Sequence, residues 1–249
     1  MENNFKSFRK DKPNRFHRFD NFIEDESNSA AVSLAKLVAK GEIIRFLNIL
    51  IIYGKSESGK THLVEAIANS QNPNHEYQKS LFLRCETLIE NLVKSVRENS
   101  RNELVNYYLD HDMLIIDDVH LLKGKQSTSD VYGSILNRFL VENKIIVLTT
   151  NVLPNNFFES EKLNSILSKS VLVSIYAPGP ETKIKILKRY LDEFLLNVPT
   201  EIIDELVQDQ DKNINLLLGN LITLVAKSSV LRTPLTKDFA RENLINKIE

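Results

Sequence analysis

The sequence is poor in cysteine and tryptophan, and neither sign of charge dominates. It has one cysteine and no tryptophan among 249 residues, which excludes an internal disulfide and a cysteine-rich zinc site. Lysine and arginine number 32 against 33 aspartates and glutamates, so no global field draws the whole chain to nucleic acid or to an anionic membrane. The apolar runs are shorter than a membrane span and the amino terminus has no apolar signal region, so we expect a cytoplasmic protein without a membrane partner.

Glycine is also scarce, and its placement is informative. Two of the seven glycines fall in the stretch GKSESGKT, directly behind the apolar run NILII. The spacing G-x-x-x-x-G-K-T is that of a phosphate-binding loop, in which successive backbone N–H groups surround a β-phosphate. The residues expected to contact a nucleotide are Gly54, Lys55, Ser56, Glu57, Ser58, Gly59, Lys60, Thr61 and His62.

The end of this loop supplies the charge and the ligand that a nucleotide with Mg²⁺ requires. Lys60 can place its ammonium on the β- and γ-phosphates, and Thr61 can offer its hydroxyl to the metal ion. A helix that begins here directs the positive end of its dipole at the anion. The predicted cofactors are therefore ATP or ADP together with Mg²⁺.

Polar residues follow two later apolar runs. MLIIDDVH ends in Asp117 and Asp118, and IIVLTTN ends in Asn151. Parallel sheets bind their ligands at the carboxyl ends of strands. We expect Asp117 to hold the Mg²⁺ shell, Asp118 to orient or deprotonate the attacking water, and Asn151 to bond the γ-phosphate or that water.

Strand and helix patterns alternate over the first 176 residues. Apolar runs predict buried strands, and the segments between them have helical spacing. The predicted strands are 47–53, 80–85, 112–120, 144–151 and 170–176, and the predicted helices are 28–40, 61–70, 86–98, 100–110 and 127–143. This alternation predicts an α/β fold with a parallel sheet that is covered on both faces.

One of these helices, 86–98, has an apolar face with regular spacing. The residues on that face are Leu88, Ile89, Leu92, Val93 and Val96. We expect this face to be buried. The single cysteine, Cys85, precedes the helix at the end of a predicted strand, where a packed thiol is expected.

Composition divides the chain into three parts. Residues 1–18 contain six Lys or Arg against two acids and no apolar periodicity, which predicts a flexible basic arm. Residues 19–176 are the expected nucleotide-binding core. Strand patterns stop after APGP, and residues 177–249 are predicted to form a second subdomain with helices at 181–195, 200–210, 213–231 and 236–248.

With these motifs, the chain resembles the AAA+ ATPase domain of the DnaA family of bacterial replication initiators. The stretches that carry the resemblance are YGKSESGKTHLVEAIAN, LVNYYLDHDMLIIDDVHLLKGK, IIVLTTNVLP and APGPETKIKIL. The resemblance implies a five-stranded αβα core followed by a helical lid, with Phe22 and Ile23 lining the adenine pocket. It also implies that residues 86–108 belong to the initiator-specific insert, which helps to contact single-stranded DNA.

Three departures from the family pattern concern the chemistry of the nucleotide. The family's arginine finger aligns with Ile166, and the sensor arginine of the lid aligns with Asn215. Glu57 stands at a glycine position where positive φ is favoured, and it brings a carboxylate near the phosphates. Because an arginine finger can be worth about 10³–10⁵ in rate, we expect nucleotide binding with slow hydrolysis or none. Whether the chain is an active enzyme stays open.

The family's origin-reading and helicase-contacting domains have no counterpart in these 249 residues. The leading hypothesis is therefore a regulator of replication initiation, similar to single-domain Hda-like relatives, that modulates the assembly or nucleotide state of DnaA. The implied partners are full-length DnaA or other replication proteins, with single-stranded DNA and self-association left open. A helicase-loader-like ATPase of the DnaC type and a degenerate scaffold that needs no nucleotide are the alternatives.

Overall fold

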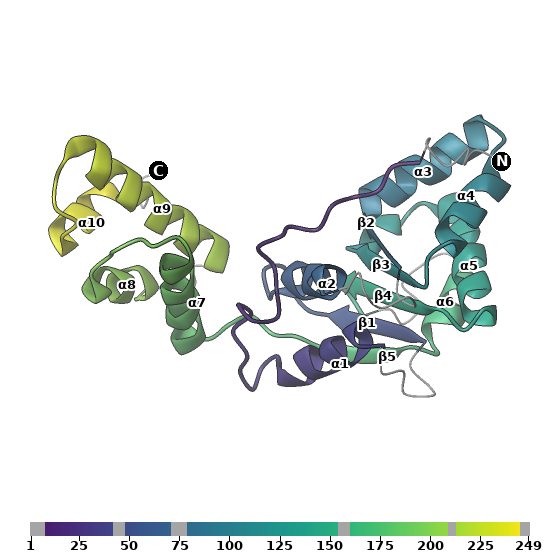
Figure 1. Cartoon of the computed structure of the whole chain (residues 1–249), viewed down its shortest axis with the longest axis horizontal. Coiled ribbons are helices and arrows are strands. Elements are labelled where there is room, and N and C mark those ends of the chain that lie inside the picture. Colours follow the sequence, from purple (N-terminus) through teal and green to yellow (C-terminus); the bar gives the residue numbers. More distant parts are fainter. Residues whose placement is uncertain (1–7, 42–47, 71–78, 154–159, 209–212, 245–249) are drawn as a thin grey trace. The chain divides into compact units, whose positions relative to one another are not determined.

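The computed structural model describes residues 8–41, 48–70, 79–153, 160–208 and 213–244. The chain divides into two compact units, residues 1–176 and 177–249 (Figure 1). The first unit contains the sheet, and the described part of the second unit is helical.

The sheet of the first unit has five parallel strands in the order β2-β3-β4-β1-β5. These strands are β1 (Ile49–Tyr53), β2 (Ser80–Arg84), β3 (Met113–Asp117), β4 (Ile145–Thr150) and β5 (Val171–Ser174). Parallel strands covered on both faces are apolar along their whole length, and this explains the continuous apolar runs in the sequence. The predicted five-stranded α/β fold is confirmed.

Helices cover both faces of this sheet. They are α1 (Ser29–Ala39), α2 (Lys60–Asn69), α3 (Cys85–Arg97), α4 (Arg101–Leu109), α5 (Gln126–Val141), α6 (Glu161–Leu167) and the 3₁₀ helix η2 (Val119–Leu122). Successive residues of β1 enter two different cores. Leu50 and Ile52 pack with α1 and α2, whereas Ile49 and Ile51 pack in the core that α3 to α6 cover. Helix α6 was not predicted, because it is short and largely polar.

The buried face of α3 differs from the prediction. Leu88 and Leu92 are buried as expected, but Val93 and Val96 are 46% and 51% exposed. The polar residue Asn91 is buried instead, because a segment from the amino-terminal part of the chain docks on it.

Cys85 is buried, as the sequence predicted, although it opens α3 instead of ending β2. Burial raises the pKa of this thiol to about 12, so it is a packed side chain without thiolate character at neutral pH.

The docked segment is residues 8–18, which we call the strap. The sequence predicted a flexible arm for residues 1–18; residues 1–7 lie outside the described residues. In Figure 1 the strap runs as a coil from α3 past β2 to α2. Phe8 is buried in the core beneath α3 and its ring lies 5.8 Å from that of Tyr107. The prediction was wrong for residues 8–18, because their contacts are with distant residues that local composition does not reveal.

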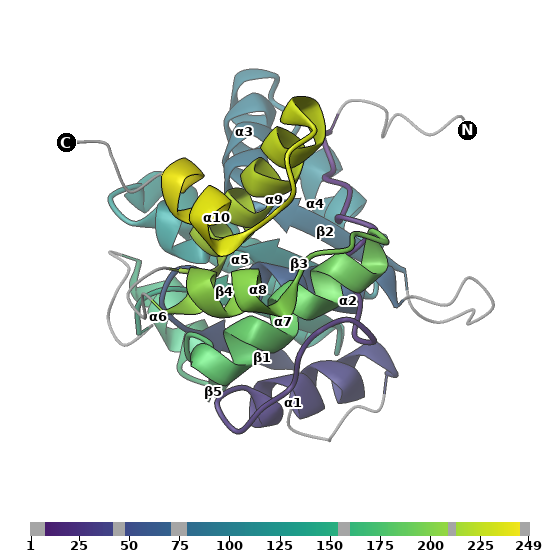
Figure 2. The same ribbon diagram turned by 90° about the vertical axis from the view of Figure 1, so that its left-hand side faces the viewer.

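In the described part of the second unit, four helices pack around one apolar core (Figure 2, green to yellow). They are α7 (Pro180–Glu193), α8 (Thr200–Val207), α9 (Ile214–Leu231) and α10 (Lys237–Asn243). Asn213 and Thr236 cap α9 and α10, since their side chains accept the amide hydrogens of Leu216 and Phe239.

Helix α9 is the one described helix that is long and apolar enough to cross a membrane, judged by length and composition alone. The sequence was expected to contain no such segment. Core helices pass the same test, and Leu217, Leu221 and Leu224 of α9 lie in the core of the second unit. These buried leucines assign α9 to that core.

Phe8 gives a test of the docked strap. Replacing Phe8 with alanine removes an aromatic ring from the core of the first unit, so we expect the free energy of unfolding to fall by about 2–4 kcal/mol. Urea unfolding followed by circular dichroism measures the loss. Phe16→Ala is the matched control, because Phe16 is 38% exposed, and it should cost about 1 kcal/mol or less. Equally small effects of both substitutions would describe a solvated arm.

Candidate functional site

The glycine-containing loop lies between β1 and α2, at the carboxyl edge of the sheet. The Gly54 amide donates to the Thr150 carbonyl across 3.1 Å, which ties the start of the loop to the end of β4. A Cβ on Gly54 would lie 2.2 Å from the Ile175 carbonyl oxygen and 2.7 Å from Ser58 Oγ. Only glycine fits at this point, because the first of these atoms belongs to the backbone.

The second half of the loop turns through positive backbone angles. Gly59 caps α2 at φ 99°, and Glu57 has φ 63°. Left-handed backbone costs an L-residue roughly 1–2 kcal/mol, so Glu57 keeps the shape of the loop at an energetic cost. Phe22 lies over the loop, since a Cβ on Gly59 would be 3.1 Å from its ring. Ile23, the other predicted adenine contact, is half-buried beside Phe22 in sequence.

The loop lysine is buried and turned inward. Lys60 Nζ donates to the Lys55 carbonyl across 2.9 Å. Burial lowers the pKa of Lys60, while the carboxylates of Asp118 and Asp117 oppose that shift. Lys55 and Ser56 are exposed at the tip of the loop, and Ser58 is buried with its hydroxyl on the Lys55 carbonyl. The ammonium group is thus held at the loop by a single backbone carbonyl.

A chain of hydrogen bonds joins α2 to β3 and β4. Thr61 Oγ1 donates to Asp117 Oδ2 across 2.8 Å, and Thr149 Oγ1 donates to Asp117 Oδ1. Asp117 is almost fully buried. Burial raises the pKa of its carboxyl, and the nearby Asp118 adds to the rise, whereas the hydrogen bonds from Thr149 and Thr61 oppose it.

Asp118 and Asn151 lie next to this chain at the ends of β3 and β4. The Asp118 amide donates to Thr149 Oγ1 across 2.8 Å, and Asp118 itself has φ 60°. The Asp118 carboxylate is half-buried and lies 3.7 Å from His120 Nδ1. Asn151 is half-buried at the end of β4. The structure therefore brings the predicted metal and catalytic residues to one edge of the sheet.

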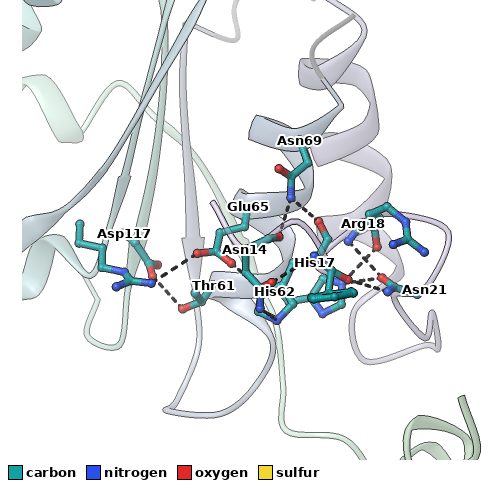
Figure 3. A network of polar contacts seen from close by, with 11 residues as sticks. Asn14, His17, Arg18, Asn21, Thr61, His62, Glu65, Asn69 and Asp117 are labelled. Atoms are coloured by element: carbon teal, nitrogen blue, oxygen red, sulfur yellow. Dashed lines mark hydrogen bonds and ion pairs between the residues drawn. The ribbon is translucent and has the colours of Figure 1, made fainter. Parts of the chain in front are cut away.

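His62 is part of a polar network that the sequence did not predict (Figure 3). Its Nε2 lies 3.1 Å from the Arg18 carbonyl and 3.2 Å from Asn21 Oδ1. Its ring stacks on His17 at 4.4 Å and meets Phe22 edge-on at 5.1 Å. His62 therefore faces the strap, and it braces Phe22 from the side of α2.

Glu65 is a second member of this network that sequence reasoning missed. It lies one turn after Thr61 on α2, its side chain is 1% exposed, and its Oε2 is 2.5 Å from His17 Nδ1. The available signal was its i+4 spacing from Thr61, which places both side chains on one helix face. Nothing in the local sequence indicates that His17 would reach this carboxylate.

The positions predicted to have lost their arginines lie on α6 and α9. Ile166 is 5% exposed and packs in the core of the first unit, so its side chain faces inward. Lys162 is exposed on the same helix and donates to Ser134 Oγ across 2.9 Å. Asn215 is exposed near the start of α9 in the second unit.

The donor set suits a small cation that is shared with phosphate and water. Among the described residues no three His, Cys, Asp or Glu side chains gather as a metal site of their own. Thr61 and Asp117 instead offer one hydroxyl and one carboxylate at the same point. Mg²⁺ is commonly held by one or two such oxygens together with nucleotide phosphates.

The strand order, the loop before α2 and the acids after β3 define the class of the chain, an α/β P-loop protein with AAA+ architecture. Within that class, the chain belongs to the bacterial DnaA ATPase domain family, whose pattern matches residues 13–174.

Individual relatives agree with this assignment. The chain is 33% identical to the chromosomal replication initiator protein DnaA of Flavobacterium psychrophilum over 230 residues, which is 92% of this chain and 48% of that protein. It therefore spans about half the length of this curated relative. Domain III of the Thermotoga maritima initiator has 27% identity and a TM-score of 0.85, covering 93% of this chain and 98% of that chain. A DnaA initiator bound to AMPPCP and single-stranded DNA has 28% identity and a TM-score of 0.76, covering 93% and 69%.

The buried carboxyl of Asp117 makes stability depend on pH. Because its pKa is raised in the folded protein, the folded state binds the proton more tightly, and stability falls as pH rises from the ordinary aspartate pKa through the raised one. Asp117→Asn should therefore be more stable than the unsubstituted protein at neutral pH, and the difference should vanish in acid.

Urea midpoints between pH 3 and pH 8 measure this effect, with Asp130→Asn on the exposed face of α5 as the control. The control should change stability by less than about 0.5 kcal/mol at every pH. A destabilised Asp117→Asn variant at neutral pH would contradict the assigned cost of burying this charge.

Proposed function

We propose that the loop at residues 54–61 binds an adenine nucleotide with Mg²⁺. The observation that carries the proposal is the convergence of Lys60, Thr61 and Asp117 at the mouth of a loop whose backbone is already turned for phosphate. Relatives support it, since a DnaA initiator has been solved with AMPPCP bound. Phe22, which lies over Gly59, and Ile23 are the proposed adenine contacts.

Each polar group at the site has a defined part in this proposal. When nucleotide binds, the Lys60 ammonium leaves the Lys55 carbonyl and bonds phosphate oxygens. Their negative charge offsets the electrostatic cost of burying the ammonium group. Thr61 and Asp117 are the residues that would hold the Mg²⁺, and its charge would favour the ionised form of Asp117 and so oppose the raised pKa of that carboxyl. The Mg²⁺ itself supplies charge neutralisation at the phosphates.

We further propose that this nucleotide is hydrolysed slowly or not at all. Asp118 and Asn151 keep positions from which a water and a γ-phosphate could be bonded. Ile166 cannot supply the positive charge of an arginine finger, because it is apolar and faces the core. Asn215 likewise carries no charge to a phosphate. The proposed balance is therefore that the site still binds the nucleotide but hydrolyses it slowly.

The biological role that fits this balance is regulation of DnaA-dependent replication initiation. The family relationship supports this role, because the matched relative is a chromosomal replication initiator protein. A member that binds nucleotide and turns it over slowly can occupy a place in an initiator assembly and alter its nucleotide state. Residues 86–108 are the proposed single-stranded DNA contact, where Lys94, Arg97 and Arg101 accompany the exposed Val93 and Val96.

Calorimetric titration with Mg-ADP and Mg-ATP tests the nucleotide proposal. Lys60→Ala should weaken binding by roughly thirtyfold or more, because a buried phosphate contact is lost. Glu57→Gln removes a negative charge from the loop and should tighten binding by about fivefold. Glu57→Gly should gain little beyond that, because the positive φ at Glu57 is present without nucleotide.

Phosphate release by the unsubstituted chain, measured in the same samples, tests the proposed slow turnover. Phosphate release at rates typical of enzymes, about 1 s⁻¹ or faster, would overturn slow hydrolysis. Titrations in which neither nucleotide binds would overturn the binding proposal and leave the nucleotide-independent scaffold.

The regulatory role is tested by adding the purified chain to a full-length DnaA from the same source. We expect a change in the ATP turnover of DnaA, in the size of its assemblies on DNA, or in both. Lys60→Ala should reduce that effect, since it removes the nucleotide contact. No change in either quantity at saturating chain would contradict the proposed role.

A further inference from the structure

The strap joins two parts of the first unit that perform different tasks in the proposal above. It runs from α3, whose last turn carries Lys94 and Arg97, to α2, which follows the phosphate loop (Figure 1). The strap contains no helix or strand. Its position is therefore set by contacts with the rest of the unit, and these contacts fall into three groups.

At α3, one buried side chain binds the strap backbone from both sides. Asn91 Oδ1 accepts the Arg9 amide hydrogen at 2.9 Å, and Asn91 Nδ2 donates to the Arg9 carbonyl at 2.8 Å. The same Nδ2 lies 3.2 Å from the Tyr108 hydroxyl on α4. Phe8 is inserted in the core next to this point. A displaced strap would leave the buried Asn91 amide without its two backbone partners, which is costly.

In the middle, the strap follows β2, which is an edge strand of the sheet. The Asp11 amide donates to the Phe82 carbonyl at 3.3 Å. The Arg84 amide donates to Asp11 Oδ2 at 2.7 Å. These bonds satisfy part of the unpaired edge of β2.

At α2, the strap is held by the side chains of His62, Glu65 and Asn69. Asn69 Nδ2 donates to the carbonyls of Asn14 and His17 at 2.7 and 2.8 Å (Figure 3). His17 bonds the buried Glu65, whose other oxygen has no hydrogen-bond partner among the described residues and lies 3.8 Å from the Arg84 guanidinium. A displaced His17 would leave that carboxylate without a hydrogen bond in the interior.

The α2 end of the strap continues directly into the proposed adenine contact. His17 stacks on His62, and His62 meets Phe22 edge-on. Asn21 bonds back to the strap, with its Nδ2 donating to the Phe16 carbonyl at 2.6 Å. The contacts of His62 and Asn21 therefore connect the position of Phe22 to the docked strap.

We propose that the strap couples nucleotide occupancy at α2 to the conformation of α3. The inference rests on the proposed nucleotide binding. A ligand that contacts Phe22 binds the docked state better than the undocked state, so binding shifts the strap toward docking. Docking then secures Asn91 and the buried face of α3. By linkage, any ligand that favours the docked form of α3 tightens nucleotide binding by the same factor.

Hydrogen–deuterium exchange on the full chain tests the coupling, with and without saturating Mg-ADP. In the unsubstituted protein, nucleotide should slow exchange in residues 8–12 and in α3 by about fivefold or more, the lower end of usual coupling between sites. Asn69→Ala removes, at an exposed position, two of the hydrogen bonds that hold the strap to α2, and it should reduce this protection at α3. The matched control is Ser70→Ala, because the Ser70 hydroxyl bonds the Ile67 carbonyl of its own helix.

A second arm needs no nucleotide. If the strap docks as one unit, Asn69→Ala should speed exchange at the distant amides of Arg9 and Asp11, and Asn91→Leu should speed exchange at the amides of His17 and Arg18. Changes confined to the end that was cut would overturn the proposal. Nucleotide binding without slower exchange at α3 would overturn it as well. If no nucleotide binds in the calorimetric titration, the proposed function itself is overturned, and the coupling then has no ligand at α2.

Discussion

The hydrogen bond between Thr61 and Asp117 joins the helix that follows the loop to the strand that carries the acids. It spans 56 positions of sequence, and it forms only if β1, β4 and β3 lie side by side with their carboxyl ends level. The burial of apolar strand residues on both faces of the sheet imposes this arrangement. The packing of the core thus brings the polar residues together at the carboxyl edge of the sheet. The close approach of Gly54 to the Ile175 carbonyl fixes the loop to the same sheet.

The sheet and the loop accommodate Glu57 and Ile166, the two unusual residues of the site. Glu57 has the positive φ of a glycine position without unwinding the loop, because the flanking Gly54 and Lys60 are held by bonds to Thr150 and Lys55. Ile166 packs in the core of the first unit, where a charged side chain would need an outlet to solvent. Both residues are compatible with folding and unfavourable for γ-phosphate chemistry. These two residues are the basis of our proposal that the site holds a nucleotide and splits it slowly or not at all.

The sheet and the loop could be predicted from the sequence because their signals are local. Each strand is a continuous apolar run, and G-x-x-x-x-G-K-T encodes its own backbone geometry. The strap could not be predicted, since Asn91 bonds Arg9 across 82 positions and no local pattern marks either residue. The exposure of Val93 and Val96 has the same origin, because the choice of the buried face on α3 depends on what docks there.

The most direct test of the account is a crystal structure of the chain with Mg-ADP. The account predicts diphosphate enclosed by the backbone amides of residues 54–61, with the Lys60 ammonium moved from the Lys55 carbonyl to a phosphate oxygen and the metal beside Thr61 and Asp117. An empty loop at saturating nucleotide, with the Glu57 carboxylate across its mouth and Lys60 still bonded to Lys55, would contradict it.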